Sequence, residues 1–235
     1  MNKLYHFGDS YATVGEFALS KHFCGVMADS IGFQYRPYGM SGLSNEQILN
    51  KLIKLLFEFE KGDIIFINFS FFQRGCWYDS NNKILKSTNV FYNEIEMKKT
   101  NYNIGEKQKI LSLLNYYIEH PEDYARKIFK LYNSILTILE SKGIKIFYIY
   151  IENTEWSDEL LNVGTNIKFE NGFSKWLLVN NLHRNEDCHY TAGIQPMLAD
   201  VILRKTNQFT YLSPNVIITI DDVDRSKIIK AEKLL

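Results

Sequence analysis

The sequence predicts an α/β fold, a three-layer α/β/α sandwich around a central parallel sheet. Three apolar runs, at residues 4–7, 64–67 and 144–151, have the continuous hydrophobic character of strands covered on both faces. Amphipathic helical patterns separate these runs, and strand–helix alternation of this kind builds a parallel sheet through right-handed crossovers. Functional side chains are therefore expected on the loops that follow the strands.

The first third of the chain alternates strands and helices closely. The predicted elements are a strand at 4–7, a helix at 14–31, a strand at 33–38, a turn at 39–42, a helix at 48–59 and a strand at 64–67. Gly32 marks the end of the first helix. Ser44 and Gln47 have the spacing of a capping box before the second helix.

The remainder fits one domain spanning residues 1–235, with an insertion at about 71–120 and a C-terminal extension after about 205. The predicted elements are a partly helical insertion near 110–118, a helix opened by Pro121 and ended by Gly143, a strand at 144–151, a strand at 176–179, a helix at 197–203 and an edge strand at 216–220. The tail after Asp221 has helical charge spacing.

Composition excludes some classes of function. Lys and Arg total 27, as do Asp and Glu, and a formal net charge of zero argues against nucleic acid or an anionic membrane as the main partner. No apolar run has the length of a membrane span. The first strand begins too early for a signal peptide, which favours a cytoplasmic protein, with export by another route left open. Three cysteines, spaced like neither a zinc site nor a disulfide framework, are interpreted as reduced thiols.

The sharpest motif is Gly8-Asp9-Ser10 at the end of the first strand. A serine at this point, facing the start of a helix, can act as a nucleophile, and its own backbone N–H can hold an oxyanion. An ordinary helix cap is the alternative interpretation of Ser10. Asp9 is expected to tie the turn rather than to take part in the chemistry.

A candidate base occurs late in the chain, in Glu186-Asp187-Cys188-His189. A carboxylate that holds Nδ1–H of His189 leaves Nε2 to take a proton from serine. Asp187 is preferred as the orienting carboxylate, and Glu186 remains the alternative. His183 is the rival base, but it has no carboxylate just before it, and Cys188 is interpreted as a packing residue.

Together these motifs resemble the SGNH or GDSL hydrolase family. Phe7-Gly8-Asp9-Ser10 matches the first block, Gly39-Met40-Ser41-Gly42 the second, and Asp187-Cys188-His189 the fifth. The resemblance extends to about Leu203 and implies a flavodoxin-like fold, a serine esterase without metal or cofactor, and an oxyanion contact from the N–H of Gly42.

The third block departs from the family pattern. Its usual Asn, whose side chain donates to the oxyanion, aligns with Ser70, and its Gly aligns with Asn68. The side-chain donor is therefore the Ser70 hydroxyl, the Asn68 amide reaching from two positions earlier, or absent.

Substrate contacts are expected from the segment that follows. Arg74 either binds an anionic group or pairs with a neighbouring acid, and Trp77, Tyr78 and Trp156 are candidate platforms for a sugar. The resemblance implies a small ester with a short acyl group, such as acetyl on a carbohydrate. Transfer of the acyl group to a sugar hydroxyl and a degenerate binding module are the alternatives, and the oligomeric state is left open.

Overall fold

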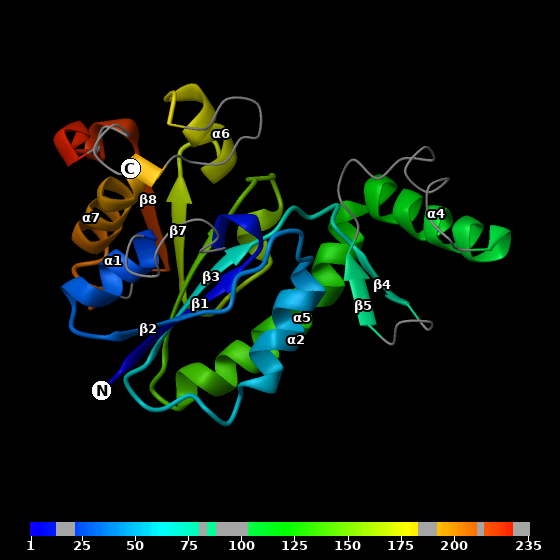
Figure 1. Cartoon of the computed structure of the whole chain (residues 1–235), viewed down its shortest axis with the longest axis horizontal. Coiled ribbons are helices and arrows are strands. Elements are labelled where there is room, and N and C mark those ends of the chain that lie inside the picture. The colour runs from blue at the N-terminus through cyan, green and yellow to red at the C-terminus, as the bar shows by residue number, and fades with distance from the viewer. Residues whose placement is uncertain (13–21, 80–83, 88–102, 183–191, 211–213, 228–235) are drawn as a thin grey trace.

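A six-stranded parallel sheet forms the centre of the protein (Figure 1). The computed structural model describes residues 1–12, 22–79, 84–87, 103–182, 192–210 and 214–227. The strands of the sheet are β1 (Lys3–Gly8), β2 (Gln34–Pro37), β3 (Ile64–Phe69), β6 (Lys145–Tyr150), β7 (Thr165–Phe169) and β8 (Asn215–Ile218). Every neighbouring pair is parallel, as the sequence predicts.

The strand order is β2-β1-β3-β6-β7-β8, which is the flavodoxin-like order with one further strand. The chain leaves β1 toward β2 and returns to place β3 on the other side of β1. Loops at such a reversal diverge and open a crevice at the carboxyl ends of the strands, where α/β proteins bind ligands. The ends of β1 and β3 therefore define the place to look for a site.

Helices cover both faces of the sheet, and Figure 1 shows the two layers. The helices are α1 (Phe23–Ser30), α2 (Asn45–Lys54), α4 (Ile104–Glu119), α5 (Pro121–Ser141), α6 (Phe173–Val179) and α7 (Gln195–Lys205). Helices α1 and α7 pack together on one face, and α2 and α5 on the other. Because β3 is buried along its whole length between these layers, its continuous apolar sequence is explained.

Two local predictions are confirmed in detail. Ser44 caps α2 in a capping box with Gln47, although the helix ends at Lys54 rather than near residue 59. Pro121 occupies the first turn of α5, and acidic residues follow it. The edge strand expected near 216–220 is β8, at one end of the strand order.

The strand predicted at 176–179 is wrong, because these residues belong to α6. The buried side chains of this helix are Phe173, Trp176 and Leu177, at helical spacing, whereas Leu178 and Val179 are exposed. The fifth strand is instead β7, whose polar residues Thr165 and Asn166 are themselves buried.

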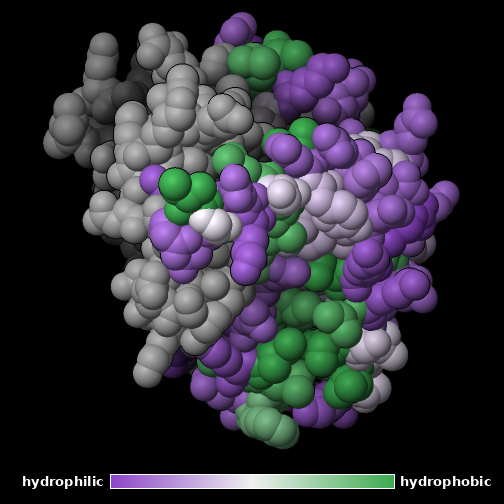
Figure 2. Space-filling view, turned by 90° about the vertical axis from the view of Figure 1, so that its right-hand side faces the viewer, coloured by the Kyte–Doolittle hydropathy of each residue, from purple (hydrophilic) through white to green (hydrophobic). Residues whose placement is uncertain are grey.

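Between β3 and α5 the chain forms an arm. It contains a hairpin of β4 (Cys76–Asp79) and β5 (Ile84–Ser87) and the helix α4, which projects from the body in Figure 1. Figure 2 faces this side and shows hydrophobic residues gathered in the lower part of the view among hydrophilic ones. Among the described helices, none combines the length and the apolar character needed to cross a bilayer.

Candidate active site

The turn after β1 is built around the Asp9 carboxylate, which is completely buried. Its Oδ1 accepts the backbone N–H of Tyr11 at 3.1 Å, and its carbonyl accepts the N–H of Ala12 at 3.0 Å. These bonds tighten the short 3-10 helix over Ser10–Ala12. Asp9 therefore ties the turn, as the sequence predicts, and fixes the backbone of Ser10.

The second carboxylate oxygen of Asp9 meets two side chains from the end of β3. The Ser70 hydroxyl donates to Oδ2 at 3.1 Å, and Arg74 Nη1 forms an ion pair with the same oxygen at 2.9 Å. Arg74 Nη1 also donates to Ser70 Oγ at 2.9 Å and to the Leu43 carbonyl at 3.3 Å. Of the two interpretations of Arg74, the structure supports pairing with a neighbouring acid.

The Ser70 hydroxyl has one hydrogen, and that hydrogen is directed to Asp9. Its oxygen accepts from Arg74. In this arrangement Ser70 braces the turn after β1 and does not present its hydrogen to a substrate. Its side chain is 1% exposed, which agrees with an internal role.

Asn45, at the start of α2, holds the backbone of Ser70 from the other side. Its Oδ1 accepts the Ser70 N–H at 2.8 Å, and its Nδ2 donates to the Ser70 carbonyl at 3.1 Å. The Asn45 carbonyl in turn accepts the Tyr132 hydroxyl of α5 at 2.7 Å. Sequence reasoning missed Asn45, although its place just after the Ser44 cap could have indicated it.

The 39–42 turn lies directly against the turn after β1. Met40 N–H donates to the Gly8 carbonyl at 3.2 Å, and a Cβ built on Gly39 would lie 2.0 Å from the Ala12 carbonyl oxygen. No side chain fits in that space, so Gly39 is required for the two turns to touch. Gly42 has a φ of 82°, a left-handed conformation that favours glycine.

Asn68, the other candidate side-chain donor, is also turned inward. Its Nδ2 donates to the Tyr11 carbonyl at 3.3 Å, and the residue is completely buried. Tyr11 is further tied to α6, because its hydroxyl donates to Ser174 Oγ at 3.2 Å. Through this hydrogen bond to Tyr11, Asn68 holds the backbone of the segment that follows Ser10.

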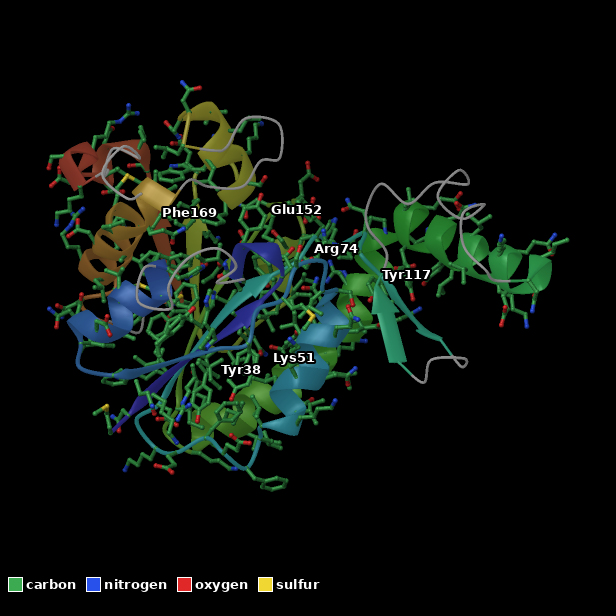
Figure 3. All side chains as sticks on the ribbon, viewed as in Figure 1. Tyr38, Lys51, Arg74, Tyr117, Glu152 and Phe169 are labelled. Atoms are coloured by element: carbon green, nitrogen blue, oxygen red, sulfur yellow. The ribbon has the colours of Figure 1, made fainter. Side chains whose placement is uncertain are left out.

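A carboxylate that sequence reasoning missed follows β6. Glu152 Oε1 accepts the Phe72 N–H at 2.8 Å, and Figure 3 shows Glu152 and Arg74 at the same edge of the sheet. Burial raises the pKa of Glu152, and the hydrogen bond from Phe72 N–H and the nearby Arg74 offset this in part. Its signal was its position directly after the strand at 144–151.

Several predicted site residues lie outside what the structure describes. These are His183, Glu186, Asp187, Cys188 and His189, together with the side chains of Ser10, Trp77 and Tyr78. The described chain resumes at Ala192, and Gln195 at the start of α7 accepts the Phe23 N–H at 2.7 Å. That bond places the residues after the His189 segment against the start of α1.

Trp156 is described and packs on Phe72, with ring centroids 4.6 Å apart.

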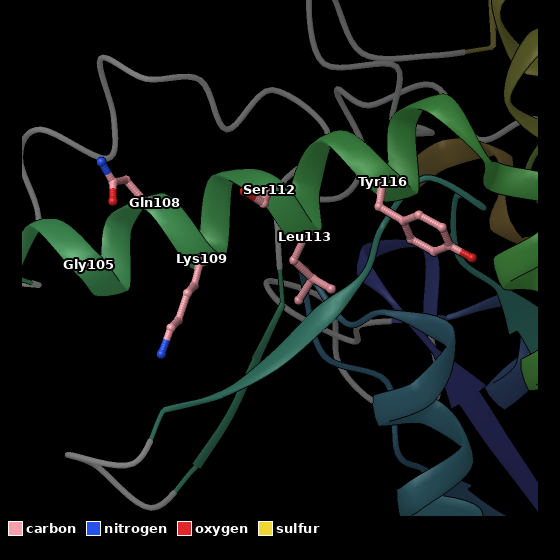
Figure 4. A pocket seen from close by; sticks show the side chains of 6 residues that line it. All are labelled: Gly105, Gln108, Lys109, Ser112, Leu113 and Tyr116. Atoms are coloured by element: carbon pink, nitrogen blue, oxygen red, sulfur yellow. The ribbon is translucent and has the colours of Figure 1, made fainter.

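A separate hollow of about 550 Å³ lies along the arm. Figure 4 shows its lining residues, all of which come from α4. None of them belongs to a loop that follows a strand of the six-stranded sheet, so the hollow is not part of the candidate active site.

No family model matches the chain, and no curated protein matches it in sequence. A solved structure similar to it is a member of the lipolytic G-D-S-L family from Veillonella parvula, with 11% identity, a TM-score of 0.48 and coverage of 87% of this chain and 97% of that chain. A catalytic mutant of an acetylxylan esterase from Geobacillus stearothermophilus has 14% identity, a TM-score of 0.45 and coverage of 86% and 93%. An extracellular lipase from Streptomyces rimosus has 11% identity, a TM-score of 0.33 and coverage of 93% and 80%. Identities this low do not carry an activity from one chain to another, so function is argued from this chain's own residues.

Proposed function

We propose that the protein is a serine esterase that hydrolyses a small ester. Ser10 Oγ attacks the ester carbonyl carbon while His189 Nε2 takes its proton, and Asp187 orients His189 through Nδ1–H. The tetrahedral intermediate then collapses, and the departing alcohol takes the proton from His189. Water hydrolyses the acyl-serine by the same sequence of steps.

The backbone N–H groups of Ser10 and Gly42 are proposed to hold the oxyanion. The observation that carries the proposal is the packing of the Ser10 turn against the 39–42 turn at the end of β1, where Gly39 lacks the side chain that would separate them. Donors fixed before the reaction stabilise developing charge without reorganising. Asp9, Arg74 and Ser70 supply that rigidity through their buried network.

An acyl group of small size, such as acetyl on a carbohydrate, is the proposed substrate. The resemblance to the SGNH family supports a short acyl chain, and the aromatic residues Trp77 and Tyr78 of β4 supply candidate sugar contacts. Arg74 is not assigned to the substrate, because its guanidinium pairs with Asp9. Transfer of the same acyl group to a sugar hydroxyl is the second candidate reaction.

Covalent labelling tests the proposal. A fluorophosphonate probe should add once, at Ser10, and Ser10→Ala should abolish both labelling and hydrolysis of short-chain aryl esters, with a loss of about 10⁴–10⁶ in turnover. Ser134→Ala, at an exposed serine of α5, is the matched control and should keep both. Hydrolysis by Ser10→Ala at the wild-type rate would contradict the assignment. A folded wild-type protein that neither labels nor hydrolyses would favour the binding module.

A further inference from the structure

Two histidines and a cysteine meet in the interior between β1 and α1. His6 lies on β1, His22 caps the N-terminus of α1, and Cys24 lies in the first turn of that helix. All three side chains are completely buried, and one ligand atom from each lies within 4.8 Å of the others. The His6 and His22 rings are tilted by 48°, with centroids 4.9 Å apart. No role in ester hydrolysis uses this cluster.

The two ring nitrogens of His6 differ in their hydrogen bonding. Nδ1 lies 3.0 Å from the Tyr35 hydroxyl, whereas Nε2 is buried without a hydrogen-bond partner among the described residues. A buried polar atom left in this state costs free energy. In the tautomer that carries its hydrogen on Nδ1 and donates it to Tyr35, Nε2 has a lone pair that can bind a metal ion.

Both ring nitrogens of His22 form hydrogen bonds. Nε2 lies 3.3 Å from the Tyr11 carbonyl, an oxygen that can accept only from a protonated nitrogen. Nδ1 accepts the backbone N–H of Cys24 at 3.3 Å, so a metal ion bound at Nδ1 would replace this hydrogen bond at the start of α1. A ligating histidine usually donates its other N–H to a backbone carbonyl in this way.

We propose that His6, His22 and Cys24 form a buried binding site for one d¹⁰ metal ion, Zn²⁺ or Cu⁺. One thiolate and two imidazoles, without a carboxylate, are the donor set that these soft or borderline ions prefer over Mg²⁺ or Ca²⁺. On binding, the Cys24 S–H bond breaks, its proton leaves to solvent, and a metal–sulfur bond forms. No electron is transferred.

The geometry requires a modest closure. Metal–sulfur and metal–nitrogen bonds of about 2.3 and 2.0–2.1 Å bring ligand atoms closer together than the present 4.8 Å limit. Binding therefore requires the three side chains to move toward one another. The site lies behind the Tyr11 carbonyl, so an ion there would clamp the turn after Ser10 from within, whatever reaction the protein catalyses.

Cobalt is the probe that tests for a zinc site. Metal-free protein titrated with Co²⁺ should show one equivalent bound, with a thiolate-to-cobalt charge-transfer band and the visible bands of a low-coordinate site, and Zn²⁺ should displace it. In a second experiment, Cu⁺ is titrated without oxygen against a chromophoric Cu⁺ chelator. Tighter retention of Cu⁺ with a failure of Co²⁺ to bind identifies the site as a Cu⁺ site.

Variants locate the site. The double variant Cys76→Ser with Cys188→Ser leaves Cys24 as the one cysteine of the chain and should bind like wild type. Cys24→Ser should lose the charge-transfer band, and His22→Gln should weaken binding at least about tenfold. Binding should also raise the thermal unfolding temperature of the double variant. The proposal is overturned if the double variant binds neither ion, or if a folded Cys24→Ser keeps the band. Should Cys24→Ser fail to fold, the double variant alone decides.

Discussion

The guanidinium of Arg74 lies 2.9 Å from the Asp9 carboxylate across 65 positions of sequence, and neither side chain has more than 8% of its surface in contact with water. This pair joins the end of β3 to the turn that follows β1. A buried pair is a weak argument for net stability, because both charges lose their hydration. Removing one side chain of the pair is expected to be costly, because the remaining charge stays buried without the opposite charge that it faced.

Arg74→Met is therefore expected to lower the free energy of unfolding by about 3–5 kcal/mol, because it leaves the Asp9 carboxylate buried without the guanidinium that it faces. Urea denaturation followed by circular dichroism measures the change. Arg126→Met is the matched control, since Arg126 pairs with Glu122 and Glu159 at the surface. That change should cost no more than about 1 kcal/mol. Equal losses in the two variants would contradict the importance of the Asp9 pair.

Asn45→Ala should both destabilise the protein and slow turnover. It leaves the Ser70 N–H and carbonyl without their partner, and each buried group left unpaired costs about 1–3 kcal/mol. The loosened start of α2 lies next to the 39–42 turn, so kcat should fall more than KM rises. Kinetics on a short-chain aryl ester measures the split.

Asn103→Ala separates these two effects. Asn103 caps α4 on the arm, where its side chain accepts the Glu106 N–H. Its loss should cost about 0.5–2 kcal/mol of stability and leave turnover unchanged. If Asn45→Ala behaves in the same manner, Asn45 has no bearing on the reaction.

Ser70→Ala should lower the free energy of unfolding by about 1–3 kcal/mol, because Asp9 and Arg74 each lose a hydrogen bond. Turnover should fall by less than the factor of about 10²–10³ that follows loss of an oxyanion donor. A drop of that larger size at constant KM would show that the hydroxyl rotates to the oxyanion.

Asn68→Ala is the paired measurement. A severe loss of turnover in this variant alone would make Asn68 the side-chain donor.

Glu152→Gln should change how stability depends on pH. Burial raises the folded-state pKa of Glu152, so the folded protein binds a proton that the unfolded chain has released. That contribution is complete below the unfolded pKa and is lost as the pH rises through the folded pKa. Gln keeps the acceptor for Phe72 N–H without a charge. Urea midpoints should show the variant gaining on wild type from about pH 4 upward, where the unfolded carboxyl ionises; a constant difference across pH would contradict this assignment.

Asp187→Asn should lower turnover by about 10²–10⁴ and leave the fold intact, because an amide in that place favours the wrong imidazole tautomer. Glu186→Gln should have little effect. Steady-state kinetics and circular dichroism on both variants measure this. Reversal of the two results would assign the orienting role to Glu186.

Much of the fold can be predicted from local patterns in the sequence. The apolar runs of β1, β3 and β6 indicate buried parallel strands. The capping box of α2 joins Ser44 to Gln47, three positions later, and α5 is indicated by Pro121 in its first turn. The strand β7 has no such signal, because buried polar residues interrupt its apolar pattern. Residues 176–179 alone form a short apolar run that resembles a strand. The helical spacing of the buried residues is visible only when Phe173 is included with them.

The sequence also predicts only part of the candidate site. The Gly-Asp-Ser turn and the tie made by Asp9 follow from neighbouring residues, so the sequence indicated them. Partners such as Asn45 for Ser70 and His6 for His22 depend on how separate strands and helices pack. No spacing in one sequence encodes those distances.

The position of β8 also bears on aggregation. This strand comes from residues 215–218 and pairs with β7. A chain that lacks residue 215 and those after it would leave that edge of β7 without its neighbour, and an open strand edge is a template for pairing with another chain. Such a truncated chain should therefore aggregate more readily than one that contains β8.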